Sequence, residues 1–155
     1  MKRAKIFSNA RFSKRGDKLA QSKYEDMVLK SLKELFPNFV IYTQYPIQNI
    51  SSDAPKELRR SKIDIFISEF DLAIEVDGEH HYKPVSYGGD LEAQVRFERK
   101  KRIDNMKDNF LEERGIHILR INTKDIDKHK AHLNDYIETL IEILLEVDNY
   151  DNNGN

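Results

Sequence analysis

The sequence predicts a three-layer α/β fold, in which a mixed β-sheet of about four strands is flanked by helices. Segments 62–67 and 72–76 are short, rich in Ile, Val and Phe, and separated by the polar turn Ser-Glu-Phe-Asp, which is typical of a β-hairpin. Amphipathic segments with helical spacing lie on both sides of this hairpin. A short apolar segment, 116–121, follows one of these helices and predicts a buried strand that pairs in parallel with its neighbour. The resulting order is α-β-β-β-α-β-α, which packs helices against a sheet.

Each element has its own local signal. Ser22 with Glu25 three residues later forms a capping-box pattern, and Pro37 ends the first predicted helix. Gly115 supplies a stop for the long central helix. In chain order we expect a helix from Ser22 to Pro37, a strand at 39–47, a loop at 50–60, the hairpin, a loop at 83–90, a helix at 91–114, a strand at 116–121 and a helix at 125–147.

Composition indicates one compact domain. The chain has 155 residues, of which 39% are hydrophobic, so a single core over 21–147 is expected, preceded by a basic arm at 1–20 and followed by a disordered acidic tail at 148–155. The absence of cysteine excludes disulfides and thiolate zinc sites. No apolar run approaches about 18 residues, and the N-terminus lacks a signal-peptide centre. We therefore expect a cytoplasmic protein without a membrane span, in the host cytoplasm if it is phage-encoded.

Three acids stand on the hairpin where core residues are expected. Side chains alternate across a strand, so Glu75 and Asp77 share one face, and a register that pairs Ser68 with Asp71 places Asp64 opposite Glu75. Opposed carboxylates about 4.5–5.5 Å apart at Cβ repel each other unless a cation neutralises them. Oxygen ligands of this kind suit Mg²⁺, or Mn²⁺. Alternation alone is explained equally well by a half-exposed strand with solvent-facing acids.

Two motifs carry a resemblance to a known family. Asp64, ten further residues and Glu75-Val-Asp77 resemble the PD-(D/E)XK nuclease superfamily, and Glu75-x-Asp77-Gly78-x-x-His81 resembles its very-short-patch-repair-type branch. A downstream motif of that branch is matched at the same spacing by Asp104, Lys107, Asp108, Leu111, Gly115, Leu119 and Arg120. The resemblance covers residues 21–121. It implies a restriction-endonuclease-like core and hydrolysis of phosphodiester bonds.

The resemblance also implies roles for individual residues. Asp64 and Glu75 are expected to bind the metal, and Asp77 to complete its coordination or orient the attacking water. Glu25 resembles an acid on the first helix of many superfamily members, although a capping-box glutamate explains it equally well. His81 is expected to act as a base, ligand or leaving-group acid. The superfamily usually has a lysine where Asp77 stands; Lys107, Lys83 and His81 are the candidates to replace it.

The net charge of −1 conceals an uneven distribution of charges. Residues 1–18 contain seven Lys or Arg and one acid, and further basic groups precede the hairpin and lie on the central helix. Such groups bind backbone phosphates, although a solvated, balanced surface is the simpler alternative. The expected nucleic-acid contacts are Lys14, Arg15, Arg59, Arg60, Arg99 and Arg102.

Together these patterns predict a small Mg²⁺-dependent DNA endonuclease that nicks or cuts duplex DNA. A nuclease-fold DNA-binding or assembly protein without cleavage activity is the second hypothesis, because the usual lysine is missing. An RNA-directed or junction-directed nuclease is the third. Double-strand cutting by one such site generally implies a homodimer; the apolar final helix either forms that interface or completes the core, and we expect core completion.

Overall fold

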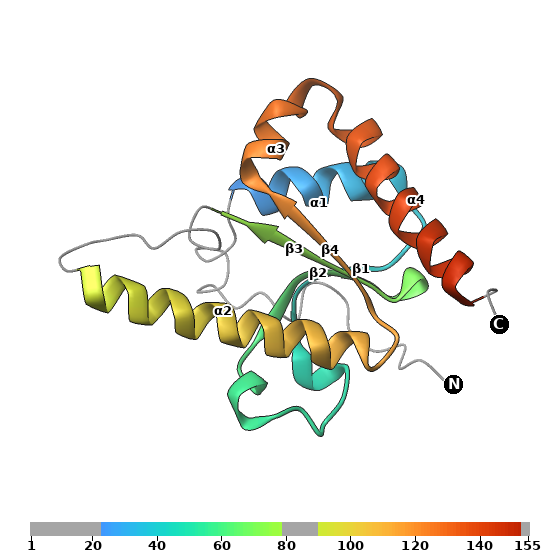
Figure 1. Cartoon of the computed structure of the whole chain (residues 1–155). Coiled ribbons are helices and arrows are strands. Elements are labelled where there is room, and N and C mark those ends of the chain that lie inside the picture. Colours follow the sequence, from blue (N-terminus) through green and yellow to red (C-terminus); the bar gives the residue numbers. More distant parts are fainter. Residues whose placement is uncertain (1–22, 79–89, 153–155) are drawn as a thin grey trace.

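The computed structural model describes residues 23–78 and 90–152 and confirms a three-layer α/β fold. Four strands form one mixed sheet, and the helices cover both of its faces: α1, α3 and α4 lie on one side and α2 crosses the other (Figure 1). The elements are α1 (Lys23–Leu35), β1 (Ile41–Pro46), β2 (Lys62–Ile67), β3 (Leu72–Asp77), α2 (Asp90–Glu112), β4 (His117–Asn122), α3 (Thr123–Lys128) and α4 (Leu133–Asn152). In the part of the chain described, no helix combines the length and apolar character that a membrane span needs.

The sheet order is β1-β2-β3-β4, with antiparallel pairs except for β3 and β4. The hairpin has the predicted register, since Ile67 pairs with Leu72 and Ile65 with Ile74. The paired ladder stops there, one step before Asp64 and Glu75. The parallel pairing of β4 with β3 is also confirmed and follows from the crossover through α2.

Two apolar clusters fill the spaces between the layers. One joins the sheet to α1, α3 and α4 and includes Val28, Leu32 and Ile74. The other lies on the α2 side and includes Phe66 and Leu111. Since Glu75 and Asp77 alternate with the buried Val76, both acids emerge on the α2 side, at the end of β3.

Strict alternation along β2 fails at one position. We expected Ile63, Ile65 and Ile67 to share one face, but Ile63 belongs to the cluster on the α2 side, whereas Ile65 and Ile67 belong to the other. The change occurs across Asp64, opposite the stretch of β1 that contains Gln44, whose φ is +48°. A residue in this conformation interrupts regular strand geometry, which explains the change of face.

The C-terminal region differs from the prediction in two ways. The single helix expected at 125–147 is divided into α3 and α4, because α3 ends at Lys128 and a 3-10 turn at Lys130–His132 redirects the chain. This turn allows Ile126 and Ile137 to pack into the same cluster. In addition, α4 continues to Asn152, so the segment 148–152, which we expected to be disordered, is helical.

A candidate active site at the end of the acidic hairpin

Asp64 is held in place from two sides. Its Oδ2 accepts a hydrogen bond of 2.9 Å from the backbone N–H of Val76, and its Oδ1 lies 3.5 Å from Nε2 of Gln44. Burial raises the pKa of Asp64, while the Val76 hydrogen bond opposes this effect. Because the Asp64 side chain bonds across to β3, its carboxylate lies on the same end of the hairpin as Glu75.

Glu75 is almost completely buried, with 4% of its surface exposed, and it forms an ion pair with a buried lysine. Nζ of Lys107 lies 2.8 Å from Oε1 of Glu75 and also donates to the carbonyl oxygen of Lys62 at 3.3 Å. Burial raises the pKa of Glu75 to about 7; the Lys107 charge opposes this shift and the Asp64 charge adds to it. Oε1 of Glu75 is shielded from solvent, and the Lys107 ammonium lies against it at 2.8 Å.

Asp77 is engaged by an arginine. Nη1 of Arg120 donates to both oxygens of Asp77, at 3.1 and 3.0 Å, and the other nitrogens of Arg120 bind both oxygens of Asp108, at 3.2 and 2.7 Å. Burial disfavours the charge of Arg120, but its bonds to Asp108 and Asp77 outweigh this and raise its pKa. This bridge ties β3, β4 and α2 together. Asp77 therefore has a cationic partner, as Glu75 has in Lys107.

Glu25 approaches the hairpin from α1. Its side chain is 8% exposed, and its Oε2 accepts a hydrogen bond of 2.9 Å from Nε2 of Gln44, the same nitrogen that faces Asp64. The structure therefore brings four of the six predicted catalytic residues to one end of the sheet: Glu25, Asp64, Glu75 and Lys107. Asp77 adjoins them through Arg120.

The remaining predicted residues divide into two groups. His81 and its neighbour Lys83, together with Lys14 and Arg15, lie outside the described residues. Arg59, Arg60, Arg99 and Arg102 are exposed, as phosphate contacts require.

Helix geometry separates the basic residues of α2. Lys100 and Arg96 lie about two and three turns before Lys107 and therefore share its side of the helix. Arg102 lies about one and a half turns before Lys107 and projects from the other side, with Arg99 on the flank. Lys100 and Arg96 are exposed and were not singled out as nucleic-acid contacts by the sequence pattern.

Sequence reasoning also missed the roles of Gln44, Asp108 and Arg120. Asp108 and Arg120 were noticed only as members of a motif; the salt bridge that joins them depends on how α2 is placed against β4. The sequence contains no signal for Gln44, because nothing in a β-strand pattern predicts a left-handed backbone at a glutamine.

The donor set is suitable for a hard cation. Asp64 and Glu75 offer only oxygen atoms, and their mutual repulsion contributes to the raised pKa of Glu75. Among residues 23–78 and 90–152, no three acidic or histidine side chains are grouped so that they could hold a metal ion. The two carboxylates therefore fit Mg²⁺ or Mn²⁺ only as part of a coordination shell that water and substrate complete, which is usual for Mg²⁺.

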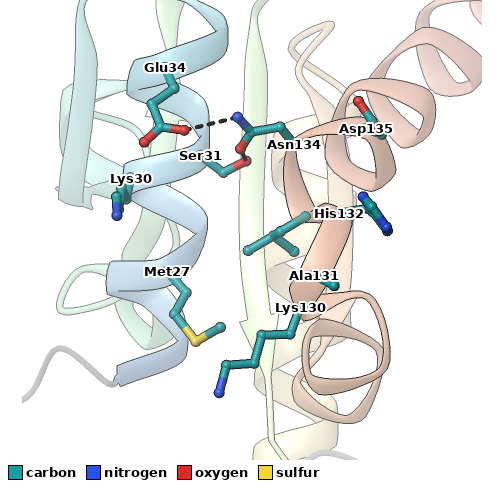
Figure 2. A pocket seen from close by; sticks show the side chains of 10 residues that line it. Met27, Lys30, Ser31, Glu34, Lys130, Ala131, His132, Asn134 and Asp135 are labelled. Atoms are coloured by element: carbon teal, nitrogen blue, oxygen red, sulfur yellow. Dashed lines mark hydrogen bonds between the residues drawn. The ribbon is translucent and has the colours of Figure 1, made fainter.

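A hollow of about 520 Å³ lies apart from these acids, between α1 and the start of α4 (Figure 2). The Ser31 hydroxyl donates to Oδ1 of Asn134, and Nδ2 of Asn134 donates to Glu34 at 2.9 Å. These polar groups satisfy one another and join the two helices. None of the candidate site residues lines the hollow.

Comparison with known proteins identifies no relative: no protein-family model, curated protein or solved structure matches the chain.

Proposed function

We propose that this protein is a metal-dependent DNA endonuclease of the PD-(D/E)XK superfamily, in its very-short-patch-repair-type branch, which hydrolyses phosphodiester bonds with Mg²⁺ or Mn²⁺. The observation that carries the proposal is the burial of Glu75 beside Lys107, within electrostatic reach of Asp64. Buried like charges are costly to a fold, so their convergence is better explained by chemistry than by stability.

Asp64 and Glu75 are the proposed metal ligands. A divalent cation held by these two carboxylates would polarise the phosphoryl oxygen and lower the pKa of a bound water molecule. Glu75 must be ionised to act as a ligand, and the Lys107 ammonium favours that form. Lys107 would also supply positive charge to a phosphate that reaches these acids. It is therefore the proposed replacement for the lysine that the superfamily usually carries where Asp77 stands.

Asp77 and Glu25 are proposed to help position the metal ligands Asp64 and Glu75. Asp77 fixes Arg120 and hence the position of α2, from which Lys107 projects. Glu25 is the fourth acid near the site, after Asp64, Glu75 and Asp77, and it is hydrogen-bonded to Gln44. His81 remains a proposed proton donor or acceptor.

DNA is the proposed substrate, bound through the basic groups around the site and through the basic N-terminal arm. Arg59, Arg60, Arg99, Arg102, Lys14 and Arg15 are the proposed phosphate contacts. Cytoplasmic action, in the host cell for a phage-encoded protein, is part of the same proposal.

Cleavage of supercoiled plasmid tests this function directly. We expect nicked or linear product with Mg²⁺ or Mn²⁺, none with EDTA, and a loss of at least about 100-fold in Asp64→Asn and Glu75→Gln, because each substitution removes a metal-binding charge while retaining side-chain size. Glu112→Gln, an exposed change on α2, is the matched control and should cleave like the unmodified protein. Equal activity in Asp64→Asn and the control would contradict the proposed site.

A DNA-binding or assembly protein without cleavage activity is the second candidate. It is favoured by the pairing of Glu75 and Asp77 with Lys107 and Arg120, which neutralises these acids without a metal. Retention of plasmid without cleavage under every metal would support it. Single-stranded DNA, a four-way junction and structured RNA, tested in parallel, would identify a nuclease with another nucleic-acid preference.

A further inference from the structure

Gln44 has a backbone conformation that is unusual for its position. Its φ is +48°, although it is not glycine and lies within strand β1. Asp71, the other non-glycine residue with positive φ in the described chain, lies in the tight turn of the hairpin, where this conformation is common. A left-handed residue inside a strand is strained, and such strain is concentrated at functional sites.

The strained residue lies directly beside the acids. Thr43 pairs with Ile65 and Tyr45 with Ile63, so Gln44 stands across from Asp64 at the point where the pairing of β1 with β2 is interrupted. Gln44 therefore departs from strand geometry at the position that faces a candidate metal ligand.

The side chain of Gln44 links two elements. Its Nε2 donates to Oε2 of Glu25 on α1 at 2.9 Å and lies 3.5 Å from Oδ1 of Asp64 on β2. An amide NH₂ group has two donors, one for each carboxylate, and a neutral donor between two acids reduces their repulsion without adding charge. Since the Val76 N–H binds the other oxygen of Asp64, the carboxylate is held from both sides.

We propose that Gln44 is a positioning residue of the active site. Its left-handed backbone directs the side-chain amide between Glu25 and Asp64, and this amide keeps the carboxylate of Glu25 on α1 close to the acids of the hairpin. Glu25 is then a member of the site and not only a residue of the first helical turn. This inference rests on the proposed metal-dependent function, and it adds a residue that neither the acidic motif nor the helix patterns indicate.

Gln44→Gly is the most informative variant, because glycine accepts a positive φ without strain while the amide is lost. We expect its thermal unfolding midpoint to be equal to that of the unmodified protein or higher. The pKa of Asp64, followed by carboxyl ¹³C NMR, should rise because a hydrogen bond to the charged form is removed. Calorimetric affinity for Mn²⁺ should fall at least fivefold. Gln44→Asn, which also tolerates this backbone but is too short to bridge both acids, should change both quantities in the same direction.

Gln48→Gly, an exposed change in the turn after β1, is the matched control and should leave both quantities unchanged. An unchanged Asp64 pKa and unchanged Mn²⁺ affinity in Gln44→Gly and Gln44→Asn would overturn the proposal, and so would tighter Mn²⁺ binding. If the unmodified protein neither binds Mn²⁺ nor cleaves DNA, the proposed function fails, whereas the Asp64 pKa still decides whether Gln44 positions that carboxylate.

Discussion

The ionisation of Glu75 is expected to make both the stability of the protein and its metal binding depend on pH. Its folded-state pKa of about 7 lies above the ordinary value of 4.5, so the folded protein holds more protons than the unfolded chain between these values. The contribution of Glu75 to stability is therefore complete below about pH 4.5 and is lost as pH rises through about 7. The same rise in pH produces the ionised carboxylate that a metal requires, so stability and activity are expected to change in opposite directions.

Titration of the Glu75 carboxyl by ¹³C NMR tests this directly. We expect an apparent pKa near 7, and Lys107→Met should move it to higher pH, because the ammonium favours the ionised carboxylate. Lys101→Met, on the exposed surface of α2, is the control. A Glu75 pKa near 4.5, or one that is unaffected by Lys107→Met, would contradict this account of the site.

The acids themselves could be located from the sequence, whereas their partners could not. Alternation and the hairpin register are local rules, and they correctly placed Asp64 and Glu75 at one end of the hairpin. The contact of Glu75 with Lys107 depends on the placement of α2 over the sheet, which no local rule specifies. The same is true of Arg120, which binds two acids from different elements.

At the scale of elements, α2 is the part of the fold most directly connected to substrate binding. In Figure 1 its N-terminal turns extend beyond the end of β3, where the acids lie. Lys100 and Arg96 are exposed on the side of α2 that carries Lys107, so they form a row of two basic groups leading to the site, with Asp104 between Lys100 and Lys107. Backbone phosphates bind to such rows through charge and release counterions in doing so.

Affinity for duplex DNA, measured over a range of salt concentrations, tests this row. We expect Arg96→Ala with Lys100→Ala to weaken binding and to reduce the slope of log K against log salt by about 2, because two phosphate contacts are lost. Arg102→Ala, from the other side of α2, should have the smaller effect. Greater loss with Arg102→Ala would show that DNA contacts the opposite side of the helix.

The elements that the sequence predicted least well are those redirected by tertiary packing. The helical pattern after β4 is continuous in the sequence, yet the chain turns between α3 and α4 so that Ile126 and Ile141 reach one apolar cluster. The four strands and their order follow from short-range signals and agree with the prediction. The hydrophobic pattern of the sequence therefore predicts which helices and strands form. The position of the turn between α3 and α4 is set by tertiary packing of their apolar side chains.

At the scale of the whole molecule, the sheet is stabilised on both faces by apolar clusters, and the acids occupy one end of it. Leu32 and Leu111 are fully buried in these clusters. Glu75 and Lys107 are nearly as buried, but the desolvation of two charges offsets their attraction. We therefore expect the stability of the fold to depend little on the Glu75–Lys107 ion pair.

Replacement of the Glu75–Lys107 ion pair tests whether the fold needs this pair for its stability. At pH 8, we expect Glu75→Leu combined with Lys107→Met to have a free energy of unfolding in urea equal to that of the unmodified protein or up to about 4 kcal/mol higher, because apolar side chains of similar size replace two buried charges together. Lys107→Met alone should be less stable than the double variant, because a buried Glu75 is left without its cation.

Leu32→Ala provides the opposite case, in which stability is lost and chemistry is retained. It should reduce the free energy of unfolding by about 2–5 kcal/mol, through the cavity left in the cluster beneath α1, and still cleave plasmid at temperatures where it is folded. The double variant should have lost cleavage under the same conditions. A double variant that is markedly less stable than the unmodified protein would mean that Glu75 and Lys107 are buried to hold the fold together, and the electrostatic argument for an active site would lose its basis.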